Sequence, residues 1–141
     1  FAASLIVNSI TGPALGLPLN PKAAKEAEKI LASSLAKFET IWLKGNAKFL
    51  LGSFQPSIAD LSLVCEIMQL EILDEKDHER ILGPHGKILE WVGNVKAATS
   101  HYFEEVHAFL YRLKAKLQRQ RSSMSDKIIT SFTEGKLPSK L

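Results

Sequence analysis

The chain has 141 residues, and 18 lysine and arginine residues against 15 aspartate and glutamate residues give it a net charge of +3. With 45% hydrophobic and 23% charged residues, its composition is that of an ordinary globular domain, which excludes a collagen, a disulfide-rich scaffold and a wholly disordered chain. No stretch reaches the roughly 18 consecutive apolar residues of a membrane-spanning helix. The single cysteine, Cys65, permits no internal disulfide and fits a reducing compartment.

The sequence opens on Phe1 rather than on methionine, and residues 1–10 are mostly apolar and uncharged. We interpret them as the last turns of a helix whose beginning is missing. Two glycines and two prolines within residues 11–19 predict a connector. Asn20 and the proline after it are typical of a helix start, because the asparagine side chain can accept hydrogen bonds from free amides of the first turn. Apolar residues at helical spacing then predict a helix over residues 21–44.

A capping box opens the next predicted helix. The Ser57 hydroxyl can accept from the amide of the third helical residue, and Asp60 can accept from the Ser57 amide near the positive end of the helix. Apolar residues then fall on nearly every face of residues 61–68, so we expect a central helix that is buried all round. Cys65 lies in this helix, and we expect it to be a buried, inert core residue.

The second half of the chain begins with an acidic segment, residues 74–79, which we interpret as a solvated loop. Apolar spacing then predicts a helix over residues 85–98 and a last helix from Ser100 to Gln120. The expected buried stripe of this last helix is Phe103, Val106, Leu110, Leu113 and Leu117.

The chain shows no convincing period-two alternation and no hairpin dipeptide, both of which are typical of β-structure. The predicted fold class is therefore all-α, a bundle of about five helices over residues 1–120. Residues 121–141 are mostly polar, and we expect them to form a mobile tail.

Residue types alone reveal no catalytic or metal site. The histidines offer no pair at the four-residue spacing that places two imidazoles on one helix face: His78, His85, His101 and His107. Glu104 and Glu105 would point about 100° apart on a helix and fit the positive end of its dipole instead. Arg112, Lys116 and Arg119 share a face that could meet phosphates. Because acids elsewhere nearly balance the charge, we favour a solvated helix end and expect no nucleic-acid partner.

The chain ends in Ser139, Lys140 and Leu141. A free C-terminal Ser-Lys-Leu is the address read by the peroxisomal import receptor, and the polar residues before it would leave it accessible. Provided that Leu141 is the true end of the polypeptide, we predict localisation in the peroxisome, the cytoplasm or both, with the import receptor as a partner. No membrane association is expected.

Residues 49–61 resemble the FLxG…SxAD signature in the C-terminal helical domain of glutathione transferases, where the Ser-x-x-Asp box caps the core helix. Residues 12–21, 42–50 and 59–66 are similar to the theta class, and to its plant members in particular. Plant theta members can also end in peroxisomal-type tripeptides. The resemblance covers about residues 1–120.

The resemblance implies a two-domain enzyme of which this chain holds only the helical domain. A thioredoxin-like domain would bind the co-substrate glutathione and carry the serine that stabilises its thiolate, so we expect this chain alone to contain no catalytic residue, bind no cofactor and be inactive. By position in the family, Val7, Ile10 and Thr11 would face the pocket for a hydrophobic electrophile, with ordinary core packing as the competing interpretation. Ser57 and Asp60 match the folding box, not the thiolate-stabilising serine.

The function that the resemblance implies is that of a glutathione transferase in detoxification. The complete enzyme would conjugate glutathione to electrophiles, reduce organic peroxides, or both, as a homodimer. A non-catalytic helical adaptor for protein–protein interaction is the alternative. Without its first domain, the bundle is expected to expose the apolar surface that docks on that domain.

Overall fold

The computed structural model describes residues 2–133, with side chains over residues 2–125. Every regular element within the described residues is helical, so the predicted all-α fold of about five helices is confirmed. The five main helices are α1 (Ala2–Ile6), α3 (Pro21–Lys37), α4 (Ile58–Met68), α5 (Glu75–Leu82) and α6 (Gly86–Thr133). Single turns join them: η1 (Val7–Thr11), α2 (Gly12–Ala14), η2 (Phe38–Trp42), η3 (Leu50–Gly52) and η4 (Gln69–Ile72).

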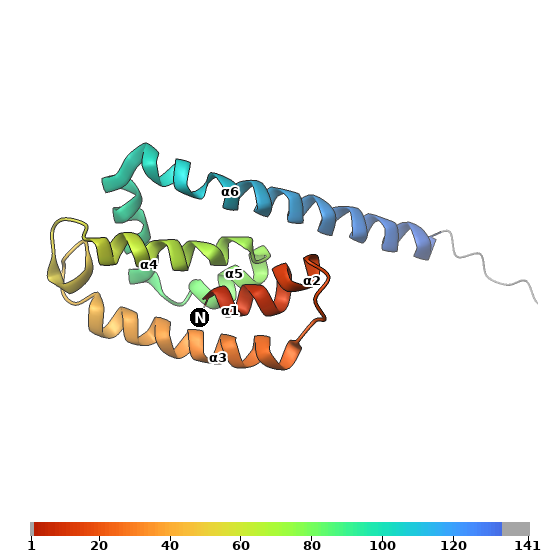
Figure 1. The fold of residues 1–141 in the computed structure, drawn as a ribbon, viewed down its shortest axis with the longest axis horizontal. Helices are drawn as coiled ribbons and strands as arrows, with labels where there is room; N and C mark the ends of the chain where they lie inside the picture. The colour runs from red at the N-terminus through yellow and green to blue at the C-terminus, as the bar shows by residue number, and fades with distance from the viewer. Residues whose placement is uncertain (1, 134–141) are drawn as a thin grey trace, which may run out of the picture.

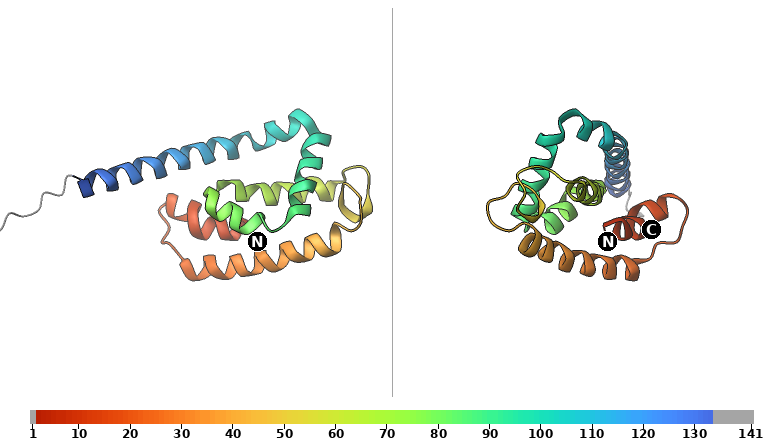
Figure 2. Two further views of the ribbon diagram at one scale, coloured as in Figure 1. Left: turned by 180° about the vertical axis from the view of Figure 1, so that it is seen from behind. Right: turned by 60° about the vertical axis from the view of Figure 1, so that its left-hand side comes forward.

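The helices pack around α4 and η4 (Figure 2). Helices α3 and α4 run antiparallel on two sides of α1, the first part of α6 closes one end of the bundle, and its second part crosses over α4 and η4 (Figures 1 and 2). The most deeply buried apolar side chains come from α4, η4 and the first part of α6: Val64, Leu70, Ile88, Trp91 and Val95. The Trp91 ring meets the Phe38 ring edge-on, with ring centroids 5.0 Å apart, which joins α6 to η2.

Helix α1 continues into a widened π-turn, η1, before the glycine- and proline-rich connector. The amide of Gly12 donates to the carbonyl of Val7, which closes this turn. A Cβ atom at position 12 would lie 2.4 Å from that carbonyl oxygen, so only glycine fits. The connector predicted over residues 11–19 therefore begins with one more helical turn, α2, than the sequence indicated.

Helix α3 starts where the sequence predicted. The Asn20 side chain accepts from the amide of Ala23 at 3.0 Å, and the buried stripe includes Ala27, Leu31 and Leu35. The helix ends in a second π-turn, η2, whose extra residue per turn shifts the residues after Phe38 off this stripe. Trp42, which follows the stripe in sequence, is 47% exposed for this reason.

Helix α4 is buried on one face only, so the expectation of burial all round is wrong. Asp60, Val64 and Ile67 are buried, whereas Ile58 and Cys65 are exposed. The neighbouring elements pack against one side of α4, and apolar character alone does not show whether a second side is covered. The expectation that Cys65 is a buried core residue is wrong for the same reason.

The acidic segment predicted as a loop is helix α5. Asp74 caps it by accepting from the amide of Asp77 at 2.8 Å, and Glu75 lies in its first turn. These acids stabilise the positive end of the helix dipole, so the charges that suggested a loop favour the helix.

The last two predicted helices form one element, α6, with a sharp break at Ser100 (φ 46°, ψ −125°). The predicted end at Gln120 is wrong, because α6 continues to Thr133. Val106 was assigned to the buried stripe, but it is 66% exposed and His107 is buried instead. The predicted targeting residues Ser139, Lys140 and Leu141 lie outside the described residues.

Candidate functional site

The carboxylate of Asp60 is fully buried in the first turn of α4. Its Oδ1 accepts from the backbone amide of Leu50 at 2.9 Å and from the indole nitrogen of Trp91 at 2.8 Å. Its Oδ2 accepts from the amide of Ser57 at 2.8 Å and from the Ser57 hydroxyl at 2.7 Å. One side chain therefore joins η3, the start of α4 and the first part of α6.

The hydrogen bonds keep this buried carboxyl ionised. Burial raises the pKa of Asp60, whereas the donors of Trp91, Leu50 and Ser57 lower it by more, and the pKa lies below its ordinary value. Because Asp60 has no exposed surface, it cannot touch a substrate. Its chemistry is structural: it fixes three segments of the fold relative to one another.

The three residues that the sequence analysis assigned to an electrophile pocket lie on η1. Val7 is 47% exposed, and Thr11 is partly buried one turn later. The Thr11 hydroxyl donates to the carbonyl of Ile6 at 3.5 Å. Ile10 is also partly buried and packs against the hydrophobic core. Val7 is thus the exposed member of this set, and Thr11 lies about one turn further along the helix.

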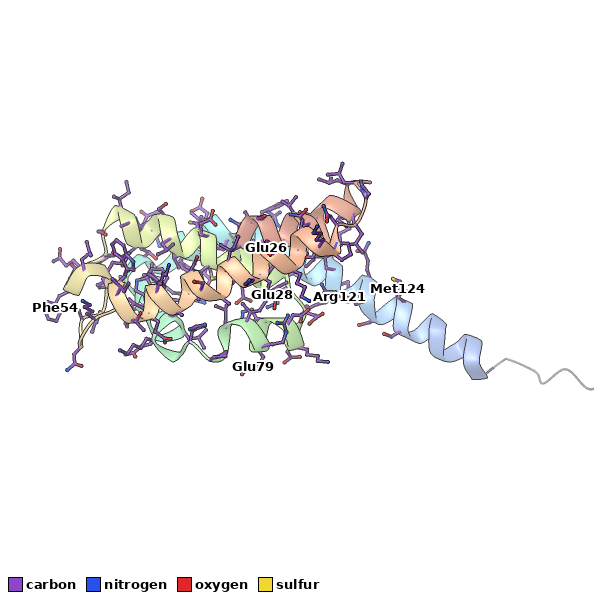
Figure 3. All side chains as sticks on the ribbon, turned by 90° about the horizontal axis from the view of Figure 1, so that it is seen from below. Glu26, Glu28, Phe54, Glu79, Arg121 and Met124 are labelled. Carbon is purple, nitrogen blue, oxygen red and sulfur yellow. The ribbon has the colours of Figure 1, made fainter. Side chains whose placement is uncertain are left out.

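A groove of about 850 Å³ borders the same segment, between α1, α3 and α5. Leu5, Asn8 and Ser9 line it, and the polar groups of the latter two donate to carbonyls one turn earlier. At its rim, the guanidinium of Arg80 on α5 pairs with Glu28 on α3, which Figure 3 labels. The hydrogen bond from Arg80 lowers the pKa of Glu28 below its ordinary value. An ion pair therefore links α3 and α5 at the rim of this groove.

A second groove, of about 760 Å³, lies between α3 and α4. Its lining is mainly apolar and includes Leu35, Phe38, Leu63 and Ile67. Ala2, at the start of α1, also lines it. The groove is therefore an apolar trough between α3 and α4.

Ion pairs hold the second part of α6 on the bundle. Lys114 pairs with Glu71 of η4 at 2.5 Å, and His78 of α5 reaches the same carboxylate at 3.1 Å. Burial raises the pKa of Glu71, but Lys114 and His78 lower it by more, so it lies below its ordinary value. At the break in α6, Lys96 pairs with Glu104 at 2.6 Å. These contacts position α6 across η4.

Sequence reasoning found Ser57 and Asp60 but missed the other two partners of the carboxylate. Leu50 and Trp91 are 10 and 31 residues from Asp60 along the chain, and no local pattern marks either as a donor to it. In the part of the chain that the structure describes, no group of three or more histidine, cysteine, aspartate or glutamate residues could hold a metal ion. No helix in that part is both long and apolar enough to cross a membrane.

Comparison with known proteins finds similarity to three transferases of Arabidopsis thaliana. Over 120 residues, which are 85% of this chain, the identity is 60% to glutathione S-transferase T1, 59% to T3 and 58% to T2. The matched region is 49% of the length of T1 and 20% of the lengths of T2 and T3, so the chain spans half or less of these relatives. No family model and no solved structure matches the chain.

Proposed function

Over the 120 residues that it shares with these relatives, the chain belongs to the theta class of the glutathione S-transferase family, and from this premise we propose that it is the helical part of an enzyme that uses glutathione. The complete enzyme conjugates glutathione to electrophiles, reduces organic peroxides, or both. The observation that carries the proposal is the identity of about 60% to a transferase about twice as long as the matched region.

In this proposal, sulfur activation lies outside the chain. A hydrogen bond to the glutathione sulfur in a separate thioredoxin-like domain favours the thiolate and lowers its pKa. The thiolate attacks the electrophilic carbon, and the leaving group departs with the bonding electrons. The helical part removes water from the apolar co-substrate and orients it.

Val7 and Thr11 form the wall of the electrophile pocket, and Ile10 positions the turn that carries them. The exposure of Val7, the one-turn spacing to Thr11 and the widened geometry of η1 support this assignment, because π-turns are frequent at functional sites. Ile10 packs against the core, which supports a role beneath the surface rather than in contact with a substrate.

The missing domain docks on apolar surface that this chain leaves open. Ile58 and Leu61 on α4 are 85% and 42% exposed, and the trough between α3 and α4 is lined mainly by apolar side chains. Both features support a second domain that covers α4 in the complete protein. The complete protein is a homodimer in this proposal, which analytical ultracentrifugation would test.

The assignment of the pocket can be tested by enlarging one side chain in the full-length protein. Val7→Phe should raise the KM for a bulky electrophile severalfold and leave the KM for glutathione unchanged. Ile41→Phe, at a similarly exposed position on η2, is the matched control and should change neither. Equal effects of the two variants would contradict the pocket assignment. A complete lack of turnover by the unaltered full-length protein would favour the helical adaptor.

The proposed localisation rests on the last three residues, Ser139, Lys140 and Leu141. A fluorescent protein that ends in residues 130–141 of this chain should collect in peroxisomes, because the import receptor reads the terminal tripeptide. The same fusion without Leu141 is the control and should stay in the cytosol. A diffuse signal from the intact fusion would refute the targeting proposal.

A further inference from the structure

The second part of α6 carries apolar side chains that face solvent. Tyr102, Val106 and Phe109 are 65%, 66% and 71% exposed. Their spacing of four and three residues places them along one face of the helix. Burying such side chains against another surface would remove apolar area from water, which is favourable.

Basic side chains continue the same face toward the end of the helix. Arg112, Lys116 and Arg119 follow Phe109 at steps of three and four residues, and all three are exposed. Within the described part of the chain, none of them forms an ion pair. No acidic residue occurs between Val106 and residue 125. The acid on this face is Glu105, at its apolar end.

This face is open to a large, flat partner. The second part of α6 runs along the outside of the bundle and extends past the ends of the other helices (Figure 1). Figure 3 labels Arg121 and Met124 on the part of α6 that extends past the ends of the other helices. A surface that approaches α6 from outside therefore meets the exposed face before it meets another helix.

We propose that the face of α6 from Tyr102 to Arg119 docks on the surface of an anionic phospholipid membrane. Membrane surfaces bind helices that combine apolar side chains, which enter the boundary between headgroups and acyl chains, with cations that meet lipid phosphates. Both kinds of side chain occur here on the same outward face. A nucleic acid would also attract the cations, and the exposed rings of Tyr102 and Phe109 could stack on unpaired bases, so binding to nucleic acid is the competing outcome that the experiment must separate from membrane binding.

Vesicle co-sedimentation of the full-length protein tests this proposal. The protein should bind vesicles of phosphatidylcholine and phosphatidylserine, and bind vesicles of phosphatidylcholine alone much more weakly. The triple variant Arg112→Gln, Lys116→Gln, Arg119→Gln should lose affinity for the anionic vesicles on the order of a hundredfold, because each cation near an anionic surface contributes roughly a fivefold gain. The matched control replaces three exposed lysines of α3 with glutamine: Lys22→Gln, Lys25→Gln and Lys29→Gln. It has the same net charge as the triple variant and should bind like the unaltered protein.

The apolar half of the face needs its own test. The variant Val106→Ser, Phe109→Ser should weaken binding to anionic vesicles at least tenfold, whereas Ile41→Ser, an exposed apolar change on η2, should not. Circular dichroism confirms that each variant keeps its helices. Equal binding by the α6 and α3 charge variants would overturn the proposal. So would tight binding to duplex nucleic acid that the serine variant leaves unchanged, since this would identify a general polyanion site.

Discussion

The replacement of Asp60 by alanine removes a carboxylate that accepts four hydrogen bonds. Two of the donors, the Leu50 amide and the Trp91 indole, are buried and would have no replacement for it. Each orphaned buried donor costs about 1–3 kcal/mol, and the lost cap at the start of α4 adds about 1 kcal/mol. Removal of a buried charge offsets part of this cost. We expect a net loss of about 3 kcal/mol, a large part of the stability of a chain of this size.

Urea unfolding, followed by circular dichroism and by the fluorescence of Trp42 and Trp91, measures this loss. Asp60→Asn is the informative companion, because its amide oxygen can still accept from Leu50 and Trp91 while its NH₂ group faces the Ser57 amide donor. Asp60→Asn should lower the free energy of unfolding by about 1–3 kcal/mol, which is less than the loss for Asp60→Ala. Ser57→Ala, which removes one hydroxyl at the exposed side of the site, should cost about 1 kcal/mol.

The pH dependence provides a second measurement on the same residue. The pKa of Asp60 in the fold lies below its ordinary value of 3.8, so the ionised carboxylate contributes stability above that value, and this contribution is lost as the pH falls below it. The stability difference between the unaltered chain and Asp60→Asn should therefore be flat near neutral pH and shrink below about pH 4. Equal stability of the two proteins at pH 7, or a difference that grows in acid, would refute the account of this site.

Four further substitutions test the backbone at Gly12, Gly93 and Ser100 and the orphaned polar atom of His107. Gly12→Ala should cost at least about 2 kcal/mol of stability, because the alanine Cβ would collide with the Val7 carbonyl. Gly93→Ala, at an open helical position, should instead stabilise the protein by about 1 kcal/mol. Equal melting temperatures for these two variants would contradict the π-turn. Ser100→Gly should stabilise by about 1 kcal/mol, because glycine adopts a positive φ without strain, and a lower melting temperature would argue against the break there. His107→Leu should raise the melting temperature by a few degrees, because the buried Nε2 of His107 has no hydrogen-bond partner in the described structure. Destabilisation by more than about 1 kcal/mol would contradict this. It would mean that the hydrogen bond from Nδ1 to the Phe103 carbonyl stabilises the fold by more than the unpaired Nε2 destabilises it.

Local patterns in the sequence predicted the parts of the fold that depend on local chemistry. The Asn20 cap and the spacing of Ser57 and Asp60 both correspond to hydrogen bonds in the structure, because both depend on residues within one turn of each other. The acidic start of α5 is also a local signal, because Asp74 caps the helix and the acids of the first turn favour the positive end of its dipole. The same charges are equally typical of a solvated loop, which is why the sequence analysis predicts a loop there.

Other features depend on contacts that no local pattern records. Leu50 and Trp91 reach Asp60 from distant segments, and the exposure of Cys65 depends on which neighbours cover α4. The burial of His107 in place of Val106 on α6 also depends on such contacts. The His107 ring packs on Phe103 with centroids 4.3 Å apart and satisfies its Nδ1 on a backbone carbonyl, so a polar residue replaces an apolar one.

The spacing of apolar residues in the sequence also does not predict where a helix widens into a π-turn. The π-turn at η1 needs the glycine at position 12, but a glycine next to a proline predicts a connector equally well. The electrophile pocket proposed at Val7 and Thr11 depends on this turn and on the glutathione-binding domain of the proposed complete enzyme, so its assignment comes from family resemblance and surface exposure together.

The central claim is that these helices serve a transferase whose sulfur-activating group lies in another domain. Its most direct test is the rate of glutathione conjugation to a reactive halide, measured for this 141-residue chain and for the full-length protein at equal concentration. We predict turnover by the full-length protein and none above the uncatalysed rate by the chain alone. Clear turnover by the isolated chain would contradict the claim, because thiolate activation would then have to come from residues within it.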